Sequence, residues 1–120
     1  MTATEKTLSM FRGDSFSVSF TFTQGEGVEE MPFDISGGKV GFTVKRNSSD
    51  TDENALLQQI SDLIVDGRTG RFAIYFPRAE TMNVPAGRFL YDIRWLNSNG
   101  DPKVLAYGDI FVKERITRGI

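Results

Sequence analysis

The side chains that could do chemistry in this sequence are carboxylates, because its 120 residues include no cysteine and no histidine. The first absence removes disulfides, thiol nucleophiles and most zinc sites. The second removes the commonest general base and transition-metal ligand. Paired carboxylates can hydrolyse glycosidic bonds, but those of this chain are scattered, at Asp14, Asp34, Asp66, Asp92 and Asp109. We therefore expect no enzymatic activity and no cofactor.

An acidic cluster, Asp50-Thr51-Asp52-Glu53-Asn54, has the Asp-x-Asp-x-Asn start of a calcium-binding loop. The rest of that loop is missing, because its sixth position is Ala55 instead of glycine and its twelfth is Ser61 instead of glutamate. Charge runs of this kind are usually solvated. The sequence therefore predicts an exposed polar loop over residues 47–54 and no metal site.

The tripeptide Arg12-Gly13-Asp14 matches the adhesion motif that integrins read. A match of three residues often arises by chance. Glycine adopts positive φ without steric cost, so the same residues also favour a turn. We expect a turn at Gly13 that leads into a strand beginning at Ser15.

The elements that position these side chains are strands, because apolar residues recur at every second position. Those that alternate with serine and threonine in Ser15–Thr23 are Phe16, Val18, Phe20 and Phe22. A strand places such residues on one face, whereas a helix would scatter them. The same period recurs in residues 39–46, 71–76, 88–96 and 103–114. Gly108 interrupts the last run, which indicates a bulge or a close backbone approach.

Weaker patterns predict strands near Thr7–Phe11, Phe33–Ile35 and Leu56–Ile60, and one helical turn at Arg78–Asn83. Turn signals separate the runs, at Gly25-Glu26-Gly27, Gly37-Gly38, Asp66-Gly67, Pro85-Ala86-Gly87 and Asn99-Gly100. Short, regularly spaced strands with turns between them are typical of a sandwich or barrel.

The segment Gly87–Tyr91 resembles the corner that opens one strand of immunoglobulin domains, with Phe89 in the place of the corner tyrosine. We predict an all-β, immunoglobulin-like antiparallel β-sandwich of about seven to eight strands, with at most one short helical turn. The length suits a single domain over residues 1–120. Short flexible arms are expected at Met1–Glu5 and Glu114–Ile120.

The charge balance argues against nucleic-acid binding, since net charge is −2 and the pI is about 5.1. No apolar run approaches the roughly 20 residues that span a bilayer. The segment Met1–Lys6 lacks the apolar core of a signal peptide. We expect a protein made in the cytoplasm that partners neither nucleic acid nor membrane.

One strand face combines charged and apolar residues. In the run Arg88–Leu96, the side opposite Tyr91 and Ile93 carries Asp92 and Arg94 between two leucines. One interpretation is an ion pair of Asp92, with Arg94 or across strands, on an exposed face. The other is a half-apolar face that docks a partner. The predicted interface residues are Leu90, Asp92, Arg94, Leu96, Arg115 and Arg118.

Five short motifs follow one another in an order typical of tailed-phage virion proteins. They are Arg12–Phe16, Met31–Gly37, Asp66–Phe72, Val84–Ile93, and Gly108–Val112 followed by Ile116-Thr117-Arg118. Their order resembles the β-sandwich domains at the N-terminus of upper baseplate proteins and in lower tail fibre proteins. In that family the domain attaches a fibre or receptor-binding protein to the tail, or serves as a small virion subunit. The chain ends at Ile120 without a shaft, which favours a free-standing subunit.

The resemblance implies a structural subunit of a tailed bacteriophage particle, in the tail, baseplate or fibre-attachment region. Its partners would be other virion proteins and further copies of itself. It would be located in the virion, after assembly in the host bacterial cytoplasm. A head decoration protein is a variant of this role at another location.

An alternative of a different class is a module that binds a carbohydrate or a host receptor, such as a host surface glycan. Tyr75, Trp95 and Tyr107 would then stack on sugar rings. Because each of them lies in an alternating strand, core or half-buried sheet positions are the favoured interpretation.

Overall fold

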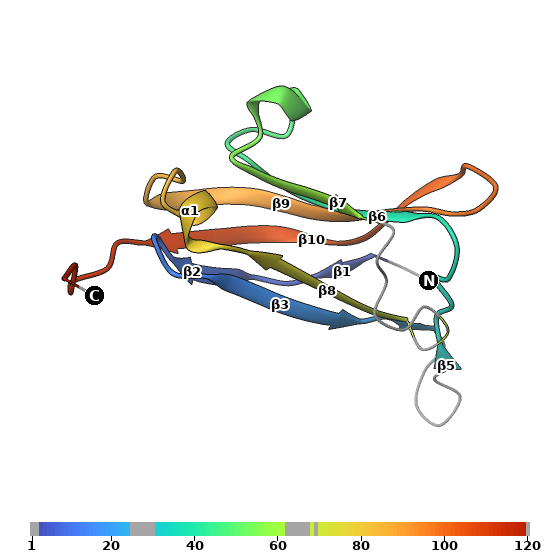
Figure 1. The fold of residues 1–120 in the computed structure, drawn as a ribbon. Coiled ribbons are helices and arrows are strands. Elements are labelled where there is room, and N and C mark those ends of the chain that lie inside the picture. Colours follow the sequence, from blue (N-terminus) through green and yellow to red (C-terminus); the bar gives the residue numbers. More distant parts are fainter. Residues whose placement is uncertain (1–2, 25–30, 62–67, 69, 120) are drawn as a thin grey trace.

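The computed structural model of the chain describes residues 3–24, 31–61, 68 and 70–119. Figure 1 shows two layers of strands. The long strands β9 (Gly87–Leu96) and β10 (Pro102–Lys113) lie in one layer, and β3 (Phe16–Thr21) and β8 (Arg71–Phe76) lie in the other. The chain is an all-β, immunoglobulin-like sandwich, as its alternating runs predict.

The larger sheet has β9 at its centre, between β10 and β6 (Lys39–Lys45), and is antiparallel to both. Strand β7 (Leu57–Ser61) extends it beyond β6. On the other side, β1 (Thr4–Glu5) and β2 (Leu8–Phe11) pair with successive parts of β10. Both of these N-terminal strands run parallel to β10, which places the start of the chain beside its end.

The smaller sheet consists of β3 and β8, which are antiparallel along their whole length. Two further short strands, β4 (Thr23–Gln24) and β5 (Met31–Pro32), pair with each other. The predicted strands near the N-terminus and before residue 61 are confirmed as β2 and β7.

The strand predicted at Phe33–Ile35 is wrong. The amide of Phe33 donates one hydrogen bond, of 2.9 Å, to the carbonyl of Phe22. The Asp34 carboxylate then accepts hydrogen bonds from the amide and the hydroxyl of Ser36. Such an aspartate offers the backbone a turn in place of a sheet ladder.

Phenylalanine rings from both sheets meet in the core. Phe42 of β6 is fully buried, and its ring lies 5.8 Å from that of Phe76 in β8 and 6.5 Å from that of Phe16 in β3. Within its own sheet it stacks on Tyr91 at 5.5 Å. Burial of apolar area drives folding, and these contacts hold the two layers together.

The alternation predicted for residues 103–114 changes phase inside β10. The register shifts between Val104 and Ala106, so Leu105 and Ala106 are both buried while Val104 is half-buried. The bulge therefore lies at Leu105. Gly108 marks the other predicted feature, a close backbone approach, because a Cβ there would lie 2.2 Å from the carbonyl oxygen of Lys6.

Short turns connect the strands. Asn97 accepts hydrogen bonds from the amides of Asn99 and Asp101, and Gly100 has a φ of +85°, which confirms the hairpin predicted between β9 and β10. The predicted helical turn is α1 (Arg78–Thr81), and the 3₁₀ turn η2 (Asp52–Asn54) lies in the polar loop before β7. The turns predicted at residues 25–27 and 66–67, and Asp66 itself, lie outside the described residues.

The Arg12-Gly13-Asp14 segment forms the predicted turn. Gly13 is buried with a φ of +87°, and the amide of Asp14 donates to the carbonyl of Phe11 at 3.2 Å. The hydroxyl of Thr81 donates to the Asp14 carbonyl at 2.7 Å, which ties the turn to α1. The motif is therefore part of the framework at this end of the sandwich.

The two predicted arms differ. Thr4 and Glu5 pair with Ala106 and Tyr107, so this part of the N-terminal arm belongs to the sheet. Residues 114–119 contain neither strand nor helix, and Figure 1 shows them leading away from the end of β10.

Candidate binding face

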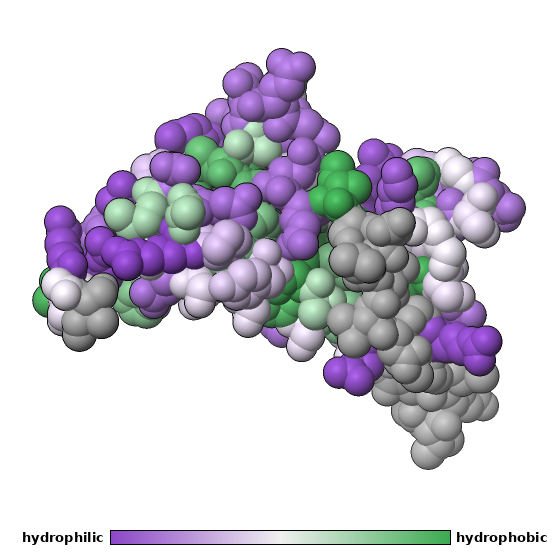
Figure 2. Space-filling view, in the orientation of Figure 1, coloured by the Kyte–Doolittle hydropathy of each residue, from purple (hydrophilic) through white to green (hydrophobic). Residues whose placement is uncertain are grey.

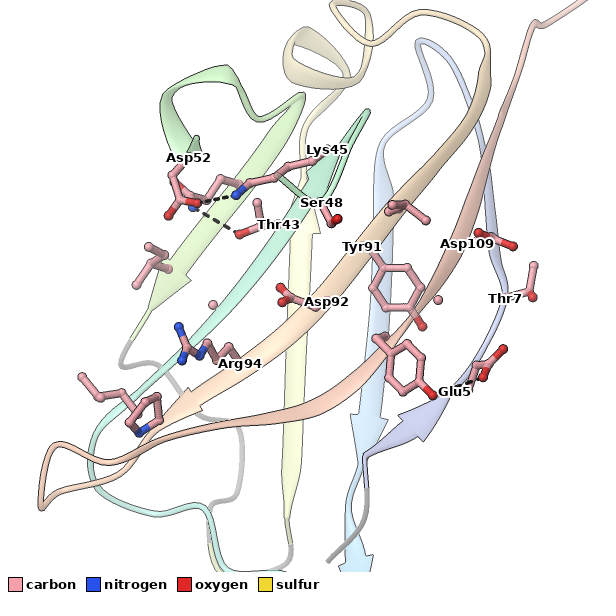
Figure 3. A pocket seen from close by; sticks show the side chains of 18 of the residues that line it. Glu5, Thr7, Thr43, Lys45, Ser48, Asp52, Tyr91, Asp92, Arg94 and Asp109 are labelled. Atoms are coloured by element: carbon pink, nitrogen blue, oxygen red, sulfur yellow. Dashed lines mark hydrogen bonds and ion pairs between the residues drawn. The ribbon is translucent and has the colours of Figure 1, made fainter. Parts of the chain in front are cut away.

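The outer face of the larger sheet, the side turned away from β3 and β8, is hollowed into a groove of about 840 Å³. Alternate residues of β6, β7, β9 and β10 form its floor, because the residues between them point into the core. We call it the outer-sheet groove; Figure 3 shows it from close by. Four predicted interface residues line it, namely Leu90, Asp92, Arg94 and Leu96.

A polar row crosses the middle of the groove from one edge of the sheet to the other. Cross-strand pairing places Gln58, Thr43, Asp92, Tyr107 and Glu5 side by side. The Gln58 amide donates to the Thr43 hydroxyl at 3.1 Å, and the Tyr107 hydroxyl donates to a Glu5 carboxylate oxygen at 3.2 Å. The outer members of the row thus satisfy one another, and Asp92 stands alone between them.

Asp92 is half-buried at the centre of this row. Burial raises the pKa of its carboxyl above the ordinary value, and the nearby Arg94 and Lys45 oppose that shift. An Asp92–Arg94 ion pair was one interpretation of the sequence and is wrong: within the described part of the chain, neither side chain forms an ion pair or hydrogen bond. Figure 3 shows both side chains in the groove without a contact between them.

The acidic loop forms one end of the groove. The Lys45 ammonium lies 2.8 Å from the Asp52 carboxylate and donates to the Asp50 carbonyl at 2.8 Å. Hydrogen bonding from Lys45 lowers the pKa of Asp52. An ammonium therefore sits where the calcium interpretation would place a cation. Among the described residues no group of three or more acidic side chains could hold a metal ion.

Apolar side chains lie between these charges. Leu90 is 39% exposed, Leu96 41%, Tyr107 43% and Ile60 60%. Sequence reasoning missed Ile60 as a groove residue, because Leu57 and Ile60 are three positions apart and give β7 no two-residue period. From the side that Figure 2 shows, apolar residues also form small patches among polar ones.

The two predicted interface residues of the C-terminal segment do not line the groove. The Arg115 guanidinium lies 3.2 Å from the Met82 sulfur and covers Gly13, where a Cβ would be 1.8 Å from it. Arg118 is exposed, and its guanidinium lies 3.7 Å from the Glu114 carboxylate. Arg115 thus packs the C-terminal segment against the Gly13 turn.

The three aromatic residues considered for sugar stacking do not form one platform. Tyr75 lies in β8 of the smaller sheet and is 56% exposed. Trp95 is half-buried and meets the Phe33 ring edge-on at 5.4 Å. Among the three, Tyr107 is the one that lines the groove.

Comparison with known proteins gives structural similarity without a family. No family model and no curated protein matches the sequence. The fibronectin(III)-like modules of CbhA from Clostridium thermocellum are 9% identical, with a TM-score of 0.46 over 97% of this chain and 94% of that one. The soluble domain of PmoD from a Methylocystis species is 8% identical, with a TM-score of 0.47 over 87% and 76%. CopC from Methylosinus trichosporium is 11% identical, with a TM-score of 0.45 over 97% and 88%.

The acidic side chains of the groove differ in their partners. Asp52 and Asp109 are paired with cations, Glu5 accepts a hydrogen bond from the Tyr107 hydroxyl, and Asp92 forms neither contact among the described residues. Among the described residues, no helix is long and apolar enough to span a membrane.

Proposed function

We propose that the chain is a structural module of a tailed-phage particle and acts through a protein–protein interface formed by the outer-sheet groove. The observation that carries the proposal is the groove floor, where the exposed Leu90 and Leu96 flank Asp92 and Arg94, which form no ion pair with any described residue. Charges on such a surface fix the register of a partner, and the apolar side chains supply most of the binding energy. The order of the sequence motifs supports placing this module in the tail, baseplate or fibre-attachment region.

A second candidate is a module that binds a host surface glycan. Tyr107 favours it, because an exposed tyrosine beside carboxylates and arginines in a groove is a usual setting for a sugar ring. A glycan array of the purified chain tests this candidate. Binding that disappears in Tyr107→Ala supports it, and an array without binding removes it.

The main proposal is tested on purified particles of the phage whose genome encodes the chain. Mass spectrometry should detect tryptic peptides such as Val104–Lys113 in a fixed ratio to the tail proteins. Particles made with Leu90→Arg in place of the wild type should lose the protein, because the new charge lies on the groove floor. Arg71→Glu, at an exposed position of the smaller sheet, is the matched control and should be retained. Particles without these peptides would refute the proposal.

A further inference from the structure

The charges of the outer-sheet groove balance one another. Its lining includes four basic residues, Lys39, Lys45, Arg88 and Arg94, and four acidic ones, Glu5, Asp52, Asp92 and Asp109. Two ion pairs of 2.8 Å, Lys45–Asp52 and Arg88–Asp109, use half of them. A face without net charge does not repel a second copy of itself, and such a face is suited to self-association.

Four of the charged side chains are left without an ion-pair partner in the described structure, namely Glu5, Lys39, Asp92 and Arg94. Glu5 accepts a hydrogen bond from the Tyr107 hydroxyl. Asp92 and Arg94 lie two positions apart on β9, the central strand, and point to the same side. An unpaired and half-buried carboxylate is unfavourable, because burial removes hydration without replacing it. A cation from a partner would relieve it.

We propose that the outer-sheet groove docks a second copy of this chain, with the two sheets face to face, their strands antiparallel, and Asp92 of each copy against Arg94 of the other. The inference rests on the proposed function, in which this groove is the interface, and it names the partner.

The order of the charges along β9 selects this arrangement among two-fold dimers. A two-fold axis that runs along the strands would set Asp92 against Asp92 and Arg94 against Arg94. An axis that lies in the interface perpendicular to the strands reverses the strand direction. Asp92 of each copy then faces Arg94 of the other. Isologous contacts of this kind occur twice in every two-fold dimer, and the pair Asp92–Arg94 is then formed twice.

The same rotation determines which residues of the neighbouring rows face each other. Leu90 and Leu96 lie at equal distances along the strand on either side of this centre, so each meets the other in the partner copy. Lys39, opposite Leu96 in β6, comes to face Lys45 of the partner copy, which is opposite Leu90 and is already paired with Asp52. Gly41, opposite Arg94, has no side chain, and the Ile60 side chain lies 3.4 Å from where its Cβ would be.

The area of the face suits a weak, reversible dimer. The span from Arg88 to Leu96 is about 26 Å and five strands are about 19 Å wide, which corresponds to roughly 500 Å² per copy. The two copies together bury about 1,000 Å², which is below the roughly 1,200–2,000 Å² of stable interfaces and in the range of weak, reversible ones. Sheet twist turns packed sheets by about 30°, so the closest contacts are those around Asp92 and Arg94.

Analytical ultracentrifugation of the 120-residue chain tests the proposal. The wild type should sediment as a monomer–dimer equilibrium, and Asp92→Arg or Arg94→Asp should weaken association at least tenfold. The double variant carrying both changes should dimerise again, since every pair is then reversed. Arg71→Glu should leave dimerisation unchanged. A monomeric wild type, or a double variant that stays as weak as the single ones, would overturn the proposal.

Crosslinking reports on the arrangement independently of charge reversal. The chain has no cysteine, so Leu90→Cys and Leu96→Cys each provide a single thiol. In the antiparallel dimer positions 90 and 96 of different copies face each other across about 10 Å, whereas the two positions 90 are roughly 20 Å apart. A short bis-maleimide should join the two variants when they are mixed and leave each alone unjoined. Efficient joining of Leu90→Cys to itself would refute the antiparallel arrangement.

The particle experiment separates this inference from the proposed function. If the chain is a monomer and Leu90→Arg still prevents incorporation into particles, the groove binds a different virion protein and the second-copy inference alone fails. If the chain dimerises as described but is absent from particles, the proposed function alone fails.

Discussion

The hydroxyl of Tyr91 in β9 donates a hydrogen bond of 2.7 Å to the backbone carbonyl of Lys6, the first of the two residues that link β1 to β2. The amide of Lys6 donates to the Tyr107 carbonyl at 3.0 Å, so both backbone groups of Lys6 are bound to the larger sheet. Burial raises the pKa of Tyr91 to about 12. The Tyr91 hydroxyl therefore binds the N-terminal segment to the larger sheet between β1 and β2, which pair with successive parts of β10.

Tyr91→Phe should lower the free energy of unfolding by about 1 kcal/mol, because it leaves the Lys6 carbonyl without this hydrogen bond. Chemical denaturation measures the loss, and hydrogen exchange should show faster exchange of the Lys6 amide. Tyr107→Phe is the matched control, since its hydroxyl binds the exposed Glu5 and its loss should cost little. Equal effects of the two variants would contradict the role of Tyr91.

Gly108→Ala should separate the N-terminal strands from β10. Its Cβ would lie 2.2 Å from the Lys6 carbonyl oxygen, a backbone atom that cannot move aside without breaking the pairing. We expect a destabilisation of about 1–3 kcal/mol. In Gly41→Ala the new methyl meets the flexible Ile60 side chain at 3.4 Å, so this control should change stability much less. A thermal melt of both variants decides the matter.

Phe42→Ala should be among the most damaging single changes, because Phe42 is fully buried and its ring contacts those of Phe16, Phe76 and Tyr91. Such a truncation costs about 3–5 kcal/mol, against a total stability of about 5–15 kcal/mol for a domain. Phe111→Ala, at a position that is 38% exposed, should cost much less. Denaturant titrations of the two variants that gave equal midpoints would refute this account of the core.

Asp92→Asn should stabilise the monomer at neutral pH, and the gain should shrink in acid. Burial raises the pKa of Asp92 in the folded state above its unfolded value of 3.8. The folded state then binds the proton more tightly, so this contribution to stability is present below pH 3.8 and is lost as pH rises through the folded pKa. Denaturation of dilute protein at pH 7 and at pH 3.5 tests the sign, and an equal gain at both pH values would contradict it.

The strand content could be predicted because serine and threonine alternate with phenylalanine and valine in Ser15–Thr23. Even there, the burial is graded: Phe20 and Phe22 are buried, whereas Phe16 and Val18 are half-buried. Periodicity gives the face on which a side chain lies, but the depth of burial depends on how far the opposite sheet extends over it.

Other features have no local signal in the sequence. In Val104-Leu105-Ala106 three apolar residues follow one another. The sequence is therefore compatible with either alternation of inward and outward side chains, and it gives no sign of the bulge at Leu105. The parallel pairing of β2 with β10 joins segments about a hundred residues apart, and no periodicity within either strand announces it. For the groove, the alternation along β9 identifies which β9 side chains point to the outer face. The polar row that isolates Asp92 depends on the pairing of five strands, which the sequence of no single strand shows.

The parallel pairing of the N-terminal strands with β10 has a consequence for synthesis on the ribosome. Phe11 leaves the ribosome about a hundred residues before its partner Lys113. At about 5–20 residues per second, roughly 5–20 s separate the two. Throughout that interval the phenylalanine-rich strand β3 has left the ribosome while the sheet that must cover it is incomplete. Closure of the sandwich therefore waits until β10 has left the ribosome, and the nascent chain must be kept from aggregation until then.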